Sequence, residues 1–212
     1  MAYSDTVWAT LEEWCPRLFI LAGVFLLVGA ANNGLAFMTD GHPFDEWLGI
    51  VLELGRLAAL LGTAGVSIEV VRRNSWVGNL NRAVASLAVV SITVLIALAS
   101  LDVAGVLADP IGIVGLVAYV LSVSTFLVVG IGVIQTDAHS RRIGGLLLGN
   151  VVALLTVFFG RLFVPLGLVA TVVPALQVLL YLGVAYDLRA LGVGVGQPTT
   201  TTDRETYSET AP

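Results

Sequence analysis

Six apolar stretches, each long enough to cross a lipid bilayer, occupy most of this 212-residue chain. A membrane-spanning helix needs about 20 predominantly apolar residues, because each adds only about 1.5 Å of length. Since 57% of the residues are hydrophobic and 12% are charged, a water-soluble fold could not bury this much apolar surface. The sequence predicts an all-α, polytopic integral membrane protein, a bundle of six transmembrane helices. We place the spans at 18–38, 48–71, 83–101, 111–135, 143–164 and 166–186.

The loops between these spans alternate between basic and acidic residues. The second and fourth loops are basic and contain Arg72, Arg73, Arg82, Arg141 and Arg142. The loops on the opposite side are acidic and contain Asp40, Asp45, Glu46, Asp102 and Asp109. Because basic residues are retained on the cytoplasmic side during insertion, this pattern predicts a multi-pass protein of the cell membrane. Its N-terminus and C-terminus are both expected in the cytoplasm.

The chain divides into three segments. Residues 1–16 form an N-terminal cytoplasmic or interfacial segment, residues 17–190 the six-helix transmembrane domain, and residues 191–212 a disordered cytoplasmic tail without apolar periodicity. Within the first segment, Ser4 is a candidate N-cap, and Trp8, Leu11 and Trp14 recur at three-residue spacing. This spacing predicts a short helix at the membrane interface, with a disordered N-terminus as the alternative.

Charge composition bears on habitat and partners. All ten basic residues are arginines, and with fifteen acidic residues the net charge is −5, a bias typical of proteins from halophilic archaea. No basic cluster exceeds an arginine pair, which argues against a nucleic-acid partner and leaves the lipid bilayer as the expected one. Gly145 and Gly149 would let a neighbouring helix approach closely. We expect this contact within the chain, with a homo-oligomer or a membrane-protein partner as the alternative.

Polar residues inside the predicted spans form one candidate site. Glu53 and Arg56 lie three residues apart, so they share a helix face and can form an ion pair. Ionisable groups at membrane depth need a partner or a water-filled cavity, which makes them candidates for function. Counting from the outer span ends places three further residues in the same layer: Asn32, Asn33 and Arg161. The five would surround an outer vestibule suited to an anion or carboxylate, or they would form only a structural ion pair with its neighbours.

Several chemistries are excluded by what the sequence lacks. Without a lysine, a retinal Schiff base is impossible. His42 and His139 lie in loops on opposite sides, so they cannot share a haem or a metal ion. Cys15 is the single cysteine and forms no redox pair. Because motifs for nucleophilic or metal-dependent hydrolysis are also missing, we expect no enzyme, no metal and no cofactor.

Three stretches of the chain carry a resemblance to a known family. They are Glu46-Trp-Leu-Gly-Ile-Val-Leu-Glu-Leu-Gly-Arg56, Ser140-Arg-Arg-Ile-Gly-Gly-Leu-Leu-Leu-Gly149, and the apolar run from Pro174 to Arg189. Over roughly residues 48–191 the chain resembles a prokaryotic family of small polytopic membrane proteins of unknown function. Ser140 stands where that family usually has proline. The resemblance implies a membrane fold and brings no activity with it.

The function that these observations favour is that of a non-catalytic structural or accessory membrane protein. The alternative is a transporter or channel for a small solute or ion, with an outer-side polar vestibule around Glu53 and Arg56. An intramembrane enzyme that acts on a lipid has the least support, because no nucleophile and base are recognisable.

Overall fold

The computed structural model describes residues 2–39, 45–104, 112–160 and 166–193. Within these ranges the fold is all-helical, and each of the six helices is long and apolar enough to cross a membrane. This agrees with the all-α expectation and fits a multi-pass membrane protein. The helices are α1 (Ala2–Thr39), α2 (Asp45–Arg73), α3 (Ser75–Val103), α4 (Gly112–Thr136), α5 (Arg141–Gly160) and α6 (Leu166–Ala190).

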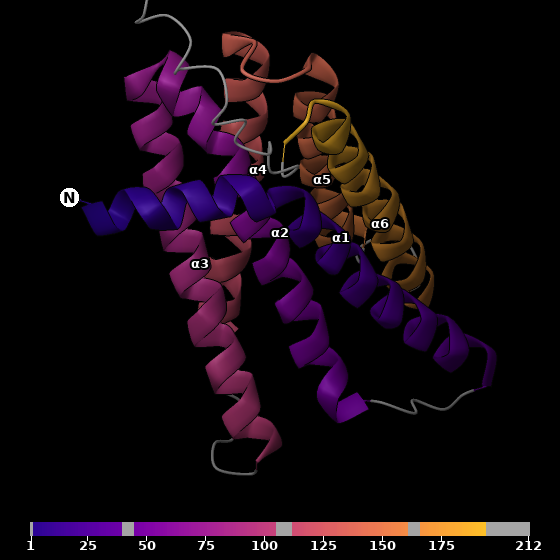
Figure 1. The fold of residues 1–212 in the computed structure, drawn as a ribbon. Helices are drawn as coiled ribbons and strands as arrows, with labels where there is room; N and C mark the ends of the chain where they lie inside the picture. The colour runs from indigo at the N-terminus through magenta and orange to yellow at the C-terminus, as the bar shows by residue number, and fades with distance from the viewer. Residues whose placement is uncertain (1, 40–44, 105–111, 161–165, 194–212) are drawn as a thin grey trace, which may run out of the picture.

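The helices pack in chain order and close into a ring, because α6 returns to contact α1 (Figure 1). Helix α2 departs from simple ring order, since it also packs against α4 across the bundle. It is accordingly the most buried of the six candidate spans. Residues on α2 therefore reach the interior of the bundle from a central position.

Helix α1 bends near Pro16. We call the part before Pro16 the crossing segment and the part after it the spanning segment. Pro16 lies inside this helix, where its ring removes a backbone hydrogen bond and clashes with the preceding turn. Figure 1 shows the N-terminal part running crosswise over the bundle before the chain turns along it. This crossing segment is helical and continuous with the first span, and it begins at Ala2. It rests on α2 at Gly65, where an added Cβ would lie 2.5 Å from the Leu11 carbonyl oxygen.

The connection between α2 and α3 is a single residue, Asn74. Its side-chain oxygen accepts a hydrogen bond from the Val77 N–H at 3.3 Å and so caps α3. Gly78 permits the tight turn, because a Cβ there would collide with the backbone of Val71. The start expected at residue 83 was therefore wrong, since α3 begins at Ser75. Arg82 lies within this helix rather than in a loop, with its guanidinium 5.0 Å from the centre of the Trp8 ring.

Glycines set the spacing of the last three helices. Helices α4 and α5 approach closely at Gly130 and Gly144, since a Cβ on Gly144 would lie 2.8 Å from the Gly130 carbonyl oxygen. Gly149 packs against Leu180 of α6, with 3.1 Å between its Cβ position and the leucine side chain. A Cβ on Gly145, by contrast, would meet no neighbouring element within 4 Å in the part of the chain that the structure describes. Of the two glycines expected to pack together, only Gly149 therefore serves contacts within the chain.

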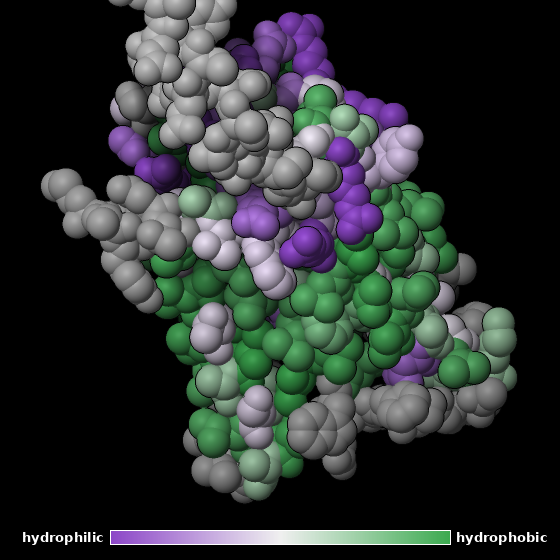
Figure 2. All heavy atoms as spheres, viewed as in Figure 1, coloured by the Kyte–Doolittle hydropathy of each residue, from purple (hydrophilic) through white to green (hydrophobic). Residues whose placement is uncertain are grey.

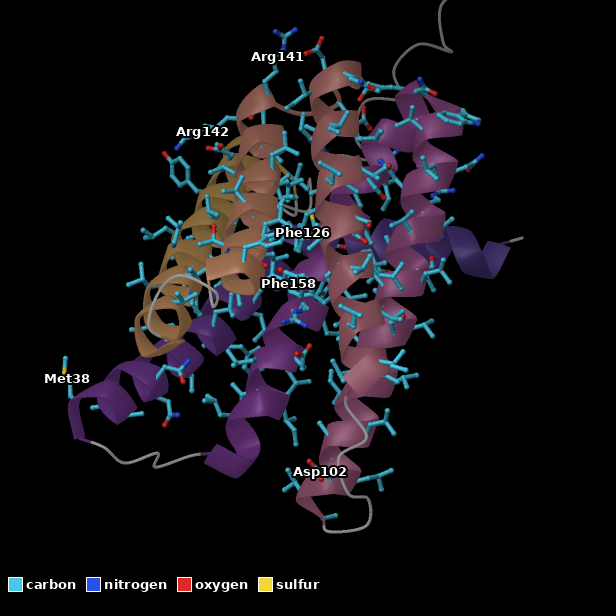
Figure 3. The ribbon with its side chains drawn as sticks, turned by 180° about the vertical axis from the view of Figure 1, so that it is seen from behind. Met38, Asp102, Phe126, Arg141, Arg142 and Phe158 are labelled. Carbon is cyan, nitrogen blue, oxygen red and sulfur yellow. The ribbon has the colours of Figure 1, made fainter. Side chains whose placement is uncertain are left out.

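Apolar side chains cover the outer walls of the bundle. Among the most exposed are Val24, Val90 and Leu179, and Figure 2 shows a largely hydrophobic wall below a hydrophilic end. The charged ends also differ, because Arg141 and Arg142 lie at one end while Met38 and Asp102 lie at the other (Figure 3). Side walls that are apolar over several helices are what a lipid environment requires.

Candidate functional site

The ion pair expected on α2 is present in the structure. Arg56 donates from Nη1 to Glu53 Oε2 at 3.0 Å. The Arg56 and Glu53 side chains are 23% and 17% exposed, respectively, so both are largely removed from solvent. The spacing of three residues places both groups on one helix face, as the sequence predicted.

Beside this pair lies a cavity of about 190 Å³ between five of the six described helices. Polar side chains reach it from four of them: Asn33 from α1, Arg56 from α2, Tyr119 from α4, and Gln177 and Tyr181 from α6. Among the described residues, Arg56 is the charged member of this lining. The remaining wall is apolar and consists of Leu26, Leu52, Phe126, Leu154, Val157 and Pro174.

The two adjacent asparagines of α1 have different surroundings. Asn33 lines the cavity. Asn32 is 2% exposed and is not part of the lining, because successive helical residues point about 100° apart. Neither amide atom of Asn32 has a hydrogen-bond partner among the described residues. Of the five predicted site residues, Asn33 and Arg56 therefore meet at the cavity, Glu53 supports Arg56, and Arg161 lies outside the described residues.

Three polar residues of the cavity lining were absent from the sequence-based site: Tyr119, Gln177 and Tyr181. Gln177 and Tyr181, together with Pro174, follow a spacing of three and four residues along α6, which places them on one helix face. Tyr181 is 2% exposed and contacts the rings of Phe19 and Phe126, with centroids 5.9 and 6.2 Å away. The periodicity of the polar residues on α6 was the signal that could have identified this face.

Tyr119 closes the cavity between α4 and α5. Its hydroxyl donates a hydrogen bond to the Leu154 carbonyl oxygen on α5. Its ring stacks on Phe158, with 5.7 Å between the ring centroids. Tyr119 is thus held at two points by the helix opposite its own.

The charged residues near the crossing segment differ from the cavity lining, because they form ion pairs with one another. Arg72 binds both carboxylate oxygens of Glu12 at 2.8 Å and also contacts Glu69 at 3.2 Å. Glu69 in turn accepts from Arg73 at 3.2 Å. The network fastens the crossing segment of α1 to α2, which is a structural role. At the same end, Asp187 pairs with Arg142 at 3.2 Å.

His139 lies in the α4–α5 turn near this network. Burial lowers the pKa of its imidazole, while a hydrogen bond to the Val66 backbone and the Glu69 and Glu12 carboxylates oppose that shift. Arg73 acts in the same direction as burial. No group of three or more potential metal ligands occurs in the described part of the chain.

Comparison with known proteins identifies no relative. No protein-family model, no curated protein and no solved structure matches this chain. The resemblance to a family of small polytopic membrane proteins therefore stays a prediction.

Proposed function

We propose that this protein is a non-catalytic transporter or channel that binds a small anionic solute in its central cavity. The observation that carries the proposal is the cavity of about 190 Å³ beside the Glu53–Arg56 pair, with Arg56 in its wall. An apolar cavity of roughly 150 Å³ in another protein holds benzene. The space here therefore suits a solute with a similar number of heavy atoms, such as a short carboxylic acid.

The chemistry of the wall supports an anion rather than a cation. The planar guanidinium of Arg56 presents several N–H donors in a fixed geometry that matches a carboxylate. Glu53 contacts one corner of that group, Nη1, and so orients it toward the cavity that it lines. The amides of Asn33 and Gln177 can donate further hydrogen bonds to a bound oxygen. In surroundings shielded from water, such charge-assisted contacts are stronger than on an exposed surface.

Membrane insertion and orientation are parts of the same proposal. The six long apolar helices support insertion into the cell membrane. The arginine-rich end, with Arg141 and Arg142 (Figure 3), would face the cytoplasm by the positive-inside rule. Both termini would then lie on the cytoplasmic side, in an organism whose proteins favour acidic residues and arginine, as in halophilic archaea.

A structural or accessory role is the second candidate. It is favoured by the local pairing of Arg56, since Glu53 already neutralises this charge at 3.0 Å. Gly145 also faces open space on α5, where a partner helix or a second copy of the chain could pack closely. In this case the cavity would have no ligand.

Binding of radiolabelled propionate to the purified full-length protein tests the two candidates. We expect saturable binding that is lost in Arg56→Gln and retained in Arg141→Gln. Arg141 is a suitable control because its side chain is 74% exposed and pairs with Asp137, and neither residue lines the cavity. Absence of binding across propionate, benzoate, chloride and phosphate would reject the solute-binding proposal and favour the structural role.

A further inference from the structure

A second hollow lies on the outer surface, between α4 and α5. This groove has a volume of about 270 Å³. On α4 its residues repeat at three- and four-residue spacing, so they form one continuous face. The groove is lined by Leu116, Tyr119, Val120, Val123 and Ser124 of α4 and by Leu155, Phe158 and Phe159 of α5.

The lining of the groove is mostly apolar, and the groove faces outward. The groove includes one serine, Ser124. Its Oγ donates a hydrogen bond to the Val120 carbonyl oxygen at 2.8 Å within the same helix, so this hydroxyl is satisfied locally. Val120 and Phe159 are 52% and 53% exposed. Because both helices are candidate membrane spans, the groove opens toward the acyl chains of the surrounding bilayer. A water-soluble solute would gain nothing from such a surface.

Tyr119 separates this groove from the central cavity. It lines both hollows, and its ring and hydroxyl contact Phe158 and the Leu154 carbonyl oxygen. The neighbouring residues of α5 divide in the same way, since Leu154 lines the cavity and Leu155 lines the groove. Figure 3 labels Phe126 and Phe158 on this side of the bundle. Tyr119 therefore borders both the outer groove and the cavity that Arg56 lines.

We propose that the groove and the cavity form one site for a single-chain amphiphile with a carboxylate head, which enters sideways from the bilayer. The carboxylate would bind Arg56, and the chain would pass Tyr119 and lie along the groove of α4 and α5. This rests on the proposed binding of an anion in the cavity and adds the ligand class and the route. Rotation of Tyr119 away from its hydrogen bond to the Leu154 carbonyl oxygen and from its stack on Phe158 would open the route.

The sizes of the two hollows favour a free acid over a phospholipid. The cavity of about 190 Å³ takes a carboxylate with a few carbon atoms, whereas a glycerophosphate head also carries a second chain at the same point. The outer groove has space along one face of α4 for a single chain. A two-chain lipid would have to leave its second chain outside both of these hollows.

Photo-crosslinking of the full-length protein in nanodiscs tests this proposal. The probe is palmitic acid with a diazirine in its chain, and labelled peptides are mapped by mass spectrometry. We expect label on residues 116–124 and 155–159, removed by excess palmitate and not by excess phosphatidylglycerol. Val120→Trp, which fills the groove, should reduce this label at least tenfold. Val90→Trp on α3 should leave it unchanged, because Val90 is similarly exposed, at 60%, and lies outside both hollows.

Two results would overturn the lateral site. One is equal label on all exposed helix faces, as for bulk lipid, and the other is full labelling of the groove in Val120→Trp. Displacement by phosphatidylglycerol would instead assign the groove to a two-chain lipid and reject the free acid. Propionate binding distinguishes failure of this proposal from failure of the proposed function. If the groove is rejected but propionate binding is lost in Arg56→Gln alone, the solute-binding cavity is still supported. An unfolding temperature of Val120→Trp close to that of the wild type shows that this variant is folded.

Discussion

The strongest quantitative prediction concerns the Glu53–Arg56 pair. Each side chain is less than a quarter exposed, and the bonded atoms lie 3.0 Å apart on the most buried candidate span. Glu53→Gln or Arg56→Gln leaves the partner charge unpaired in surroundings that solvate it poorly. Breaking a buried pair in this way costs about 3–5 kcal/mol. The double variant leaves two neutral amides that can hydrogen-bond each other, so we expect it to recover most of that loss.

Cys15 supplies the assay for this double-mutant cycle. It is the single cysteine and is 1% exposed, so a thiol-reactive fluorescent dye reports unfolding. At about 2–4 °C per kcal/mol, each single variant should unfold roughly 6–20 °C earlier in detergent and high salt. The double should lie much closer to the wild type, and Arg141→Gln should change little. Additive single effects would refute the pairing, whereas neutral or stabilising single changes would mean that the charges serve something other than folding.

Two further predictions concern the end of the bundle that carries the crossing segment. Gly65→Ala should lower the unfolding temperature, because its Cβ would lie 2.5 Å from the Leu11 carbonyl oxygen and overpacking costs about 1–3 kcal/mol. Gly145→Ala, in open space, should raise the unfolding temperature slightly through helix propensity, and equal effects of the two would contradict the docking of the crossing segment. Stability should also fall as the pH drops below about 6.5, because partial burial lowers the pKa of the His139 imidazole and the unfolded state then binds more protons. His139→Gln should remove this decrease in a pH series of unfolding temperatures, and an unchanged slope would contradict it.

The fold class was predictable because bilayer thickness and hydropathy both act locally along the chain. The start of α3 was not, since its first turns contain Asn79, Asn81 and Arg82, which hydropathy cannot distinguish from a loop. Asn74 was nevertheless a readable N-cap signal directly after the basic end of α2. Polar residues at a helix end extend it beyond the apolar core, so hydropathy alone sets the boundary too late.

The candidate site was only partly predictable, for a different reason. Glu53 and Arg56 interact within one helix, so their spacing sufficed. The contributions of Tyr119 and Gln177 depend on which helices are neighbours, and hydropathy contains no information on helix order. The packing of α2 against α4 across the ring brings Arg56 and Tyr119 to one cavity. Asn32 and Asn33 likewise have different surroundings only because they point in different directions from α1. Composition does not indicate which of the two faces the cavity.

Hydroxyl and amide side chains inside the bundle differ in what they indicate about function. Thr63 and Ser67, both fully buried, donate at 2.7 Å to backbone carbonyl oxygens of their own helix, so their polarity is satisfied locally. An amide has two polar atoms, and neither amide atom of Asn32 finds a partner among the described residues, at a cost of about 1–3 kcal/mol per group. Amides at such positions therefore reduce stability unless a ligand or a neighbouring element uses them. Asn32 lies outside the cavity, whereas Asn33 and Gln177 line it, so the proposed function concerns the cavity and not the polar content of the spans as a whole.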